Sequence, residues 1–204
     1  MTHIATDGTR GYRNQLRAHQ AAETRTRILD ATVRVMATGL ASLSIPSVAH
    51  EAGVSVPTIY RHFGTKRDLL AAVYPHLARR AGLGDVVEPR SMDEFREMVR
   101  AIFGRLDSFD DLARAAVASP AGEEARRITM PDRFAMSRRF VETIGPTLPA
   151  VDRDRIARIM VILTTTSSLR MWRDHLGRSA DQAVDDVDWV LRSVISTATS
   201  GNGR

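Results

Sequence analysis

The stretch from residue 44 to residue 66 reads SIPSVAHEAGVSVPTIYRHFGTK and carries start and stop signals for two short helices. Ser44 can cap the first helix, because its hydroxyl accepts a hydrogen bond from a backbone N–H that has no helical partner. Pro46 is tolerated in the first turn, and Gly53 can end the helix in the left-handed conformation. Apolar residues recur between these signals at helical spacing: Ile45, Val48, Ala49 and Ala52. The segment predicts a short helix with one apolar face.

A second helix is predicted directly after a turn at Val54. Ser55 can cap it, Pro57 falls in its first turn, and Ile59 and Phe63 lie four residues apart on its inner side. Its outer side then carries the polar residues Thr58, Arg61 and His62. Val56 and Tyr60 lie at the flanks of this side. Two helices joined by a Gly-containing turn, the second with a polar outer face, form the helix-turn-helix pattern. In that motif the second helix enters the major groove of DNA.

The same stretch resembles a known family signature. The pattern is Ala49-x-x-Ala52-Gly53-Val54-Ser55, followed by Thr58-Ile59-Tyr60-x-His62-Phe63-x-x-Lys66, and it resembles that of the tetracycline-repressor (TetR) family of bacterial regulators. Residues 24–77 resemble the family's DNA-binding layout, whereas the remainder is similar only in length, helical character and the stretch at 172–177. Val56-Pro57 departs from the small residue or Gly common in the family, which bears on the bases that are read.

The resemblance implies an all-α protein with an N-terminal three-helix helix-turn-helix DNA-binding domain and a C-terminal helical domain for ligand binding and dimerisation. We expect a basic disordered arm over residues 1–22, the DNA-binding domain over residues 23–80, and the effector-binding and dimerisation domain over residues 81–204. Flexible basic arms beside such domains can contact the minor groove or phosphates. A solvated tail without a function is the alternative for residues 1–22.

Charge divides unevenly along the 204 residues. Residues 1–80 hold 11 basic and 5 acidic side chains, a net of +6, whereas residues 81–204 hold 18 basic and 19 acidic side chains, a net of −1. The excess positive charge therefore lies in the part with the helix-turn-helix, as expected of a phosphate-binding half joined to a neutral half. There is no cysteine, no apolar run approaches the ~20 residues of a membrane span, and the N-terminus lacks a signal-peptide apolar segment. We expect a cytoplasmic protein with no membrane association.

Helical periodicity extends on both sides of the central stretch. A helix is predicted over Thr24–Thr38, and Thr65 with Asp68 can form a capping box for a fourth helix that ends or kinks near Pro75. Further helices are predicted over 92–106, 110–118, 122–144 (bent or broken by Pro131), 152–175 without interruption, and 181–197. No strand pattern is present in the sequence.

The last two predicted helices are long and apolar, and a short turn joins them. By resemblance they pair with their twofold mates, so we expect a homodimer through the last two helices. Twofold pairing is also the usual way in which a single helix-turn-helix reaches useful affinity. The hydroxyl run at 164–168 fits close helix approach, or else a polar stripe that lines an internal cavity.

Enzyme chemistry has no support in the sequence. The six histidines show no metal-ligand spacing, there is no GxSxG motif or phosphate-cradling glycine loop, and adjacent carboxylates such as Glu123 and Glu124 fit solvated helix faces. We expect no catalytic residue, no metal and no cofactor.

The resemblance assigns candidate binding residues in both halves. The DNA-binding candidates are Arg25, Arg27, Ser44, Ser47, Ser55, Val56, Pro57, Thr58, Tyr60, Arg61, His62, Thr65 and Lys66. The candidates for lining an effector pocket, with plain core packing as the alternative for each, are Phe95, Met98, Phe103, Phe134, Met136, Met160, Leu163, Thr164 and Ser167.

The expected function is that of a ligand-responsive homodimeric transcriptional repressor, which binds a palindromic double-stranded DNA operator and releases it when a small apolar or amphipathic effector binds. The alternative is a DNA-binding regulator of the same fold with no small-molecule effector, acting constitutively or under the control of a protein partner. An enzyme or carrier in the C-terminal half would need a convergent polar cluster that the sequence does not contain.

Overall fold

The computed structural model describes residues 7–39, 43–82 and 88–201, which form helices joined by turns, with no strand among them. This confirms the all-α fold class. The chain divides into two compact units: residues up to His76 with Asp111–Arg126, and Leu77–Asp110 with the residues from Arg127 onward. Two helices, α5 (Val73–Arg80) and α8 (Pro120–Ile144), belong partly to each unit. Within the described ranges, no helix is both long enough and apolar enough to cross a membrane.

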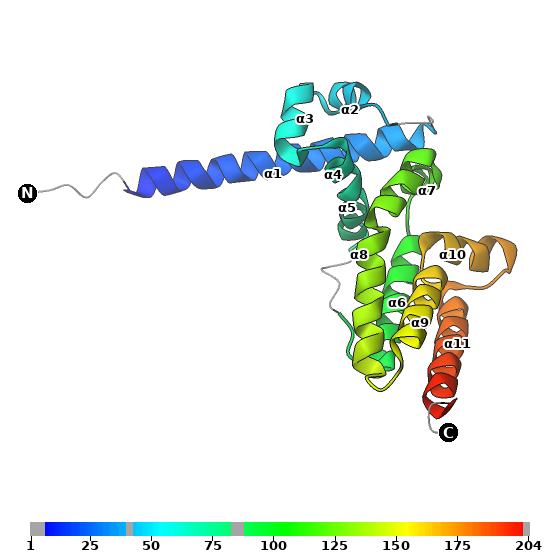
Figure 1. The fold of residues 1–204 in the computed structure, drawn as a ribbon. Coiled ribbons are helices and arrows are strands. Elements are labelled where there is room, and N and C mark those ends of the chain that lie inside the picture. The colour runs from blue at the N-terminus through cyan, green and yellow to red at the C-terminus, as the bar shows by residue number, and fades with distance from the viewer. Residues whose placement is uncertain (1–6, 40–42, 83–87, 202–204) are drawn as a thin grey trace, which may run out of the picture. The chain divides into compact units, whose positions relative to one another are not determined.

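The first unit is built on α1 (Asp7–Ala37), against which α2 (Ile45–Ala52) packs (Figure 1). The helices α3 (Val56–Phe63) and α4 (Lys66–Ala71) follow, and α7 (Asp111–Ala118) lies along α1 as well. The core of this unit consists of fully buried aliphatic side chains from α1 to α4: Ile28, Leu29, Val33, Met36, Val48, Ile59, Leu69 and Leu70.

The three short helices begin at the predicted caps, and the first of them ends at the predicted glycine. The Ser44 and Ser55 hydroxyls accept from backbone N–H groups three residues ahead, at 3.4 and 3.3 Å. Gly53 ends α2 with φ +63°, in the left-handed region. Thr65 and Asp68 form the predicted capping box, with both backbone-to-side-chain distances at 3.1 Å. Helices of eight or six residues are marginal alone, so these caps and the buried face together fix them.

Pro75 lies in the first turn of α5, and the fourth helix ends just before that turn, near the proline as predicted. Pro75 has no N–H to donate to the carbonyl of Ala71, and its ring crowds that carbonyl. Accordingly α4 ends at Ala71 and a new helix starts at Val73, which remains fully buried.

The start of α1 differs from the expectation. A disordered arm over residues 1–22 is wrong for residues 7–22, because α1 begins at Asp7 rather than near Thr24; residues 1–6 lie outside the described residues. Every side chain from residue 11 to residue 23 is exposed. Because this part of the helix buries no face, its sequence needs no periodic apolar residues, and periodicity does not predict it. This part extends the buried C-terminal half by propagation, which costs far less than nucleation.

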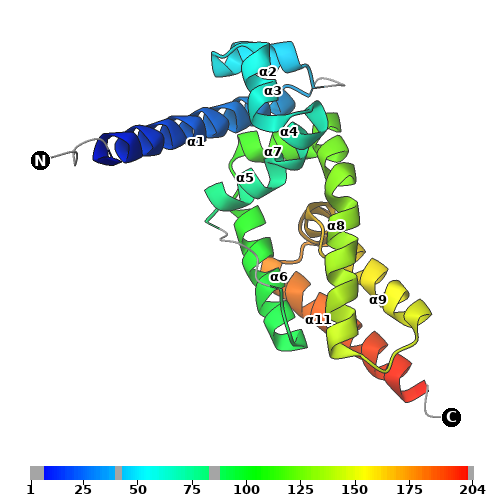
Figure 2. The same cartoon turned by 60° about the vertical axis from the view of Figure 1, so that its left-hand side comes forward.

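The second unit contains α6 (Met92–Asp107), α9 (Ala150–Leu163), α10 (Thr166–Arg170), the π-helical turn η1 (Met171–His175) and α11 (Ala180–Gly201), with most of α8. Figure 2 shows these helices from a second side. In their core, the rings of Phe95 on α6 and Phe140 on α8 stack with centroids 5.1 Å apart. Ile156 and Met160 of α9 and Val184 and Leu191 of α11 complete this core.

The prediction of one uninterrupted helix over residues 152–175 is wrong. The helix stops at Leu163, and α10 and η1 follow as separate pieces. The hydroxyl run causes the break: Thr164 Oγ1 donates to the Met160 carbonyl at 2.7 Å, and Thr165 Oγ1 caps α10 by accepting from the Ser168 N–H at 3.1 Å. These side-chain bonds compete with the continuous backbone ladder.

The unit boundary also differs from the predicted one at residue 80. Residues 111–126, assigned to the effector domain, pack in the first unit. Gly122 permits close contact there, since a Cβ on it would lie 2.5 Å from the Ala116 carbonyl oxygen. Pro131 lies inside α8 without ending it.

Candidate functional site

The helix α3 is strongly two-sided. Ile59 and Phe63 are buried in the first unit, whereas Tyr60 and Arg61 are exposed, with Tyr60 45% accessible. Three further outer residues, Val56, Thr58 and His62, are half-buried. The described structure gives Arg61 no hydrogen bond or ion pair, so its guanidinium is available to a ligand that meets this face.

Arg25 fastens the C-terminal end of α3. Its Nη1 donates to the His62 carbonyl at 2.8 Å, and its guanidinium carbon lies 4.2 Å from the centroid of the Phe63 ring. A guanidinium can satisfy a terminal carbonyl and cover an aromatic face at once. Arg25, predicted as a phosphate ligand, therefore has a structural role in this unit. Burial, followed by the charges of Arg61 and Arg25, lowers the pKa of His62, which keeps its imidazole neutral at pH 7.

Thr65 and Lys66 form the entry to α4. The Thr65 hydroxyl is used by the capping box, while Lys66, at the first helical position, pairs with Glu124 of α8 at 3.5 Å. Both side chains of this pair are about one third accessible, at 34% and 40%. The only lysine of the chain thus lies at a helix N-terminus, where an anion would be favoured, and already holds a carboxylate.

The remaining DNA-binding candidates surround the turn of the motif. Ser44 and Ser55 are helix caps, and the Ser55 and Thr58 hydroxyls share a hydrogen bond of 2.9 Å. Ser47 is half-buried, and Pro57 and Arg27 are exposed. The structure thus brings most of the candidates from α2, α3 and α4 to the outer side of one motif, with the three hydroxyls of Ser44, Ser55 and Thr65 partly occupied by capping.

Residues 28–73 match the sequence profile of the bacterial regulatory proteins of the tetR family. These residues form a TetR-family DNA-binding domain. The chain is accordingly a DNA-binding transcriptional regulator, and the family's members are regulators rather than enzymes.

Solved structures share the fold of this chain. One is a transcriptional regulator from Rhodococcus sp. RHA1, 19% identical, with a TM-score of 0.51 over 86% of this chain and 97% of the other. A TetR-like transcriptional regulator from the same organism is 18% identical, with a TM-score of 0.50 over 89% and 97%. No curated protein matches the chain.

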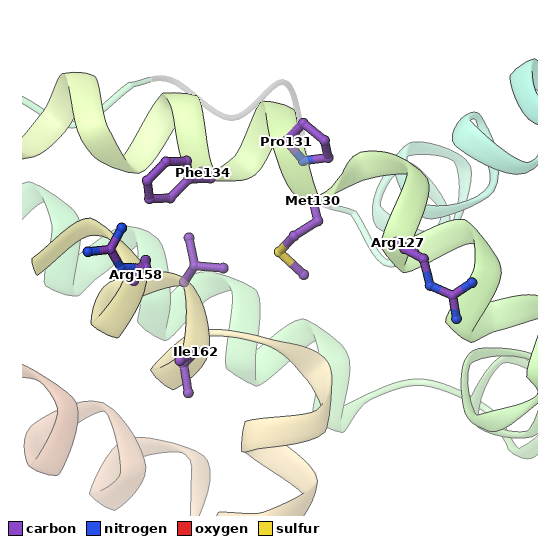
Figure 3. A pocket seen from close by; sticks show the side chains of 7 residues that line it. Arg127, Met130, Pro131, Phe134, Arg158 and Ile162 are labelled. Carbon is purple, nitrogen blue, oxygen red and sulfur yellow. The ribbon is translucent and has the colours of Figure 1, made fainter. Parts of the chain in front are cut away.

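A cavity of about 490 Å³ lies in the second unit between α8 and α9. Its lining is Arg127, Met130, Pro131, Phe134, Arg158, Val161 and Ile162. Figure 3 shows Met130, Phe134 and Ile162 around the space, with Arg127 and Arg158 on opposite sides of it. Neither arginine has an ion-pair partner among the residues that the structure describes. The cavity is thus an open, apolar pocket with two available cationic groups.

A second, enclosed cavity of about 40 Å³ lies beside it, and its volume suits water rather than an organic ligand. Four of the predicted pocket residues line this small cavity, namely Phe95, Met98, Met136 and Thr164, and Phe134 lines the large one. Phe103 and Met160 are fully buried core residues, Leu163 packs against that core, and Ser167 is exposed. These four line neither cavity.

Of the residues that line the large cavity, only Phe134 is among the predicted pocket residues. Met130 and Phe134 are four apart on α8, and Arg158 and Ile162 are four apart on α9, so each pair shares a helix face. The spacing predicts these shared faces, but nothing in the sequence says that the two faces meet. Pro131 by itself predicts only a bent or broken helix.

The first turns of α8 are tied to the first unit. The Tyr74 hydroxyl donates to the Gly122 carbonyl at 3.2 Å, and Arg126 donates to that hydroxyl at 3.1 Å and pairs with Glu123. The cavity lining begins at Arg127, where the second unit begins. Because Pro131 has no N–H, the Arg127 carbonyl lacks its helical partner. The backbone ladder of α8 is therefore weakest in the turn that forms one wall of the cavity.

The described residues contain no cluster of His or carboxylates that could hold a metal.

The pair of Lys66 and Glu124 predicts that loss of the Glu124 charge raises the affinity for DNA. A phosphate can engage Lys66 fully only after Glu124 releases it, so we expect Glu124→Gln to tighten binding to any duplex about two- to fivefold, the range of an exposed ion pair. Fluorescence anisotropy with a 40-base-pair duplex measures the change.

Glu123→Gln is the matched control, because it removes the same charge one residue away, from a carboxylate paired with Arg126 instead. Equal tightening by the two variants would assign the effect to net charge and leave Lys66 without this competitor.

Proposed function

We propose that the chain is a homodimeric, ligand-responsive repressor that binds a palindromic operator in the cytoplasm and releases it when a small amphipathic molecule binds. The observation that carries this proposal is the two-sided helix α3, whose buried Ile59 and Phe63 hold Arg61 and Tyr60 outward. Arg61 and Thr58 would hydrogen-bond to base edges, and Val56 and Pro57 would meet a thymine methyl. Tyr60, Thr65, Lys66 and Arg27 would hold phosphates and set the register.

The apolar residues exposed in the last helices support dimerisation. Trp189 of α11 is 71% accessible, and Ile162, Met171 and Leu176 are exposed on the preceding segments. A tryptophan in this state is a strong candidate for an interface anchor, because its burial against a partner removes a large apolar area from water. A second copy of the chain is the proposed partner.

The cavity between α8 and α9 supports an effector. Its volume suits a small organic molecule, and its lining combines Met130, Phe134 and Val161 with the guanidinium groups of Arg127 and Arg158. This chemistry favours an amphipathic molecule with an anionic head. A ligand there would contact the weakened turn of α8, and about two turns before Pro131 the same helix carries Glu124, the partner of Lys66. Release would follow if ligand binding favoured a geometry of α8 that suits DNA poorly.

The alternative is a regulator of the same fold with no small-molecule effector. The small volume of the enclosed cavity, about 40 Å³, favours it, since no effector fits there. The two functions differ in whether the open cavity of about 490 Å³ is occupied by a ligand that changes DNA affinity.

We expect selection from a random DNA pool to enrich an inverted repeat, read by sequencing at two salt concentrations. Arg61→Gln should change the preferred base at one position of each half-site, with a penalty of about 1–3 kcal/mol on the original base. Arg67→Gln, an equal loss of charge from an exposed residue of α4, serves as the control and should keep the preference. Enrichment of no sequence, with binding that only collapses as salt rises, would remove the repressor function.

We expect Trp189→Arg to convert the dimer to a monomer and to weaken operator binding at least tenfold, because a charge replaces the anchor of the interface. Sedimentation equilibrium gives the mass directly. Ala101→Arg adds the same charge to an exposed position of α6 and should leave the mass unchanged. A wild-type protein that is monomeric at micromolar concentration would refute the dimer.

We expect dodecanoate, below its micelle concentration, to bind the protein in calorimetry and to lower its affinity for the selected operator. Arg158→Gln should weaken dodecanoate about tenfold, the loss of one charge-assisted contact, and leave the affinity for dodecanol unchanged. Arg155→Gln is the control, because Arg155 is on the same helix but pairs with Asp152 and does not line the cavity. Absence of binding by both amphiphiles would favour the effector-free regulator.

A further inference from the structure

The N-terminal half of α1 contributes no buried side chain to the core of the residues that the structure describes. Side chains 11–23 are exposed, whereas the core begins at Ile28, and Figure 1 shows this half of α1 running on past α2 and α3. The segment also contains Gly8 and Gly11, each of which disfavours a helix relative to alanine. An isolated helix of this length is marginal in water. A binding surface that uses the segment as a helix would explain why it extends α1.

The charge of this segment indicates the surface. Arg13 and Arg17 lie four residues apart on one face, both are exposed, and neither has an ion-pair partner among the described residues. Glu23, six residues after Arg17 on the same helix, pairs with His19 at 3.2 Å instead. Two available arginines on one helix face complement a polyanion.

Helix geometry gives the place where these arginines would act. Arg25 holds the end of α3 through the His62 carbonyl. Arg17 and Arg13 precede Arg25 by eight and twelve residues, which at about 1.5 Å per residue places them roughly 12 and 18 Å farther along α1. Along B-form DNA the same length covers about four to five base pairs. On a helix that follows the duplex, these side chains would therefore meet phosphates outside the bases that α3 alone can reach.

We propose that the N-terminal half of α1 is a second DNA-contacting element, in which Arg13 and Arg17 bind backbone phosphates that flank each half-site. The inference rests on the proposed DNA-binding function and adds to it a sequence-independent contact. It converts a regulator with a compact footprint into one with a wider footprint and a steeper dependence on salt.

The experiment compares the full chain with Arg13→Ala/Arg17→Ala, using the selected operator extended to 40 base pairs. Each lost phosphate contact lowers the slope of log affinity against log salt by about 0.9, so the double variant should lower it by about 1.8 per protomer. Gln15→Ala/Gln20→Ala is the matched control in the same helix and should leave the slope unchanged. Hydroxyl-radical footprinting should show protection shortened by several base pairs on the outer sides.

A second variant tests the helical form of the contact. No atom lies within 4 Å of the position that a Cβ on Gly11 would occupy, so Gly11→Ala changes helix propensity without a clash. It should tighten binding to the extended operator up to about fivefold, and it should not tighten binding to an operator trimmed to the half-sites.

Two results would overturn the inference: an unchanged salt slope in Arg13→Ala/Arg17→Ala, or equal effects of Gly11→Ala on both operators. Tyr12 and Leu16, 67% and 46% accessible, allow a rival in which this helix packs on a second copy. If Tyr12→Ser/Leu16→Ser changes the mass while the arginine variant changes nothing, that rival replaces the proposal. Specific operator binding by the wild-type chain survives either result, whereas its absence removes the proposed function itself.

Discussion

The functional surface of the first unit depends on the burial of one side of a helix that is too short to be stable alone. The helix α3 has eight residues, and its place is set by Ile59 and Phe63 in the core, by the Ser55 cap and by Arg25 at its other end. Each constraint fixes the rotation of the helix about its axis. Once Ile59 and Phe63 are inside, Arg61 and Tyr60 have no position except the outer face. Capping and core packing therefore determine which side chains DNA can meet.

The parts of this arrangement that depend on neighbours in sequence could be predicted from the sequence. The caps at Ser44, Ser55 and Thr65 and the stop at Gly53 act over three or four residues, so their residue types are enough. The family signature spans the same region. Two features could not be predicted. The helix over residues 7–22 has no periodic apolar face, because it extends the buried half of α1 by propagation. The association of residues 111–126 with the first unit depends on contacts with α1 far away in sequence.

One error, the uninterrupted helix predicted over residues 152–175, has its physical origin in the competition of side chains with the backbone. The apolar pattern over residues 152–175 predicts one helix, but the hydroxyls of Thr164 and Thr165 satisfy local backbone groups and end it. In α8 the opposite occurs, since Pro131 removes one backbone donor and the helix nevertheless continues. Apolar packing along α8, through residues such as Phe134 and Phe140, outweighs the loss of one hydrogen bond. Pattern alone does not give the balance between these terms.

Magnitudes decide which contact could drive release of DNA. Moving a two-state equilibrium from 1:99 to 99:1 takes about 5.5 kcal/mol of differential binding. The exposed pair of Lys66 and Glu124 can contribute at most about 1 kcal/mol, so a change in that pair alone cannot act as the switch. Burial of apolar surface contributes about 25 cal/mol per Å², which means that roughly 220 Å² buried in only one of the two states would suffice. The open pocket of about 490 Å³, lined by Met130, Phe134, Val161 and Ile162, can hold a ligand with that much apolar surface. The free energy for release of DNA would then come from ligand contacts with the cavity wall at the weakened turn of α8. The contact between Lys66 and a phosphate would change only as a consequence.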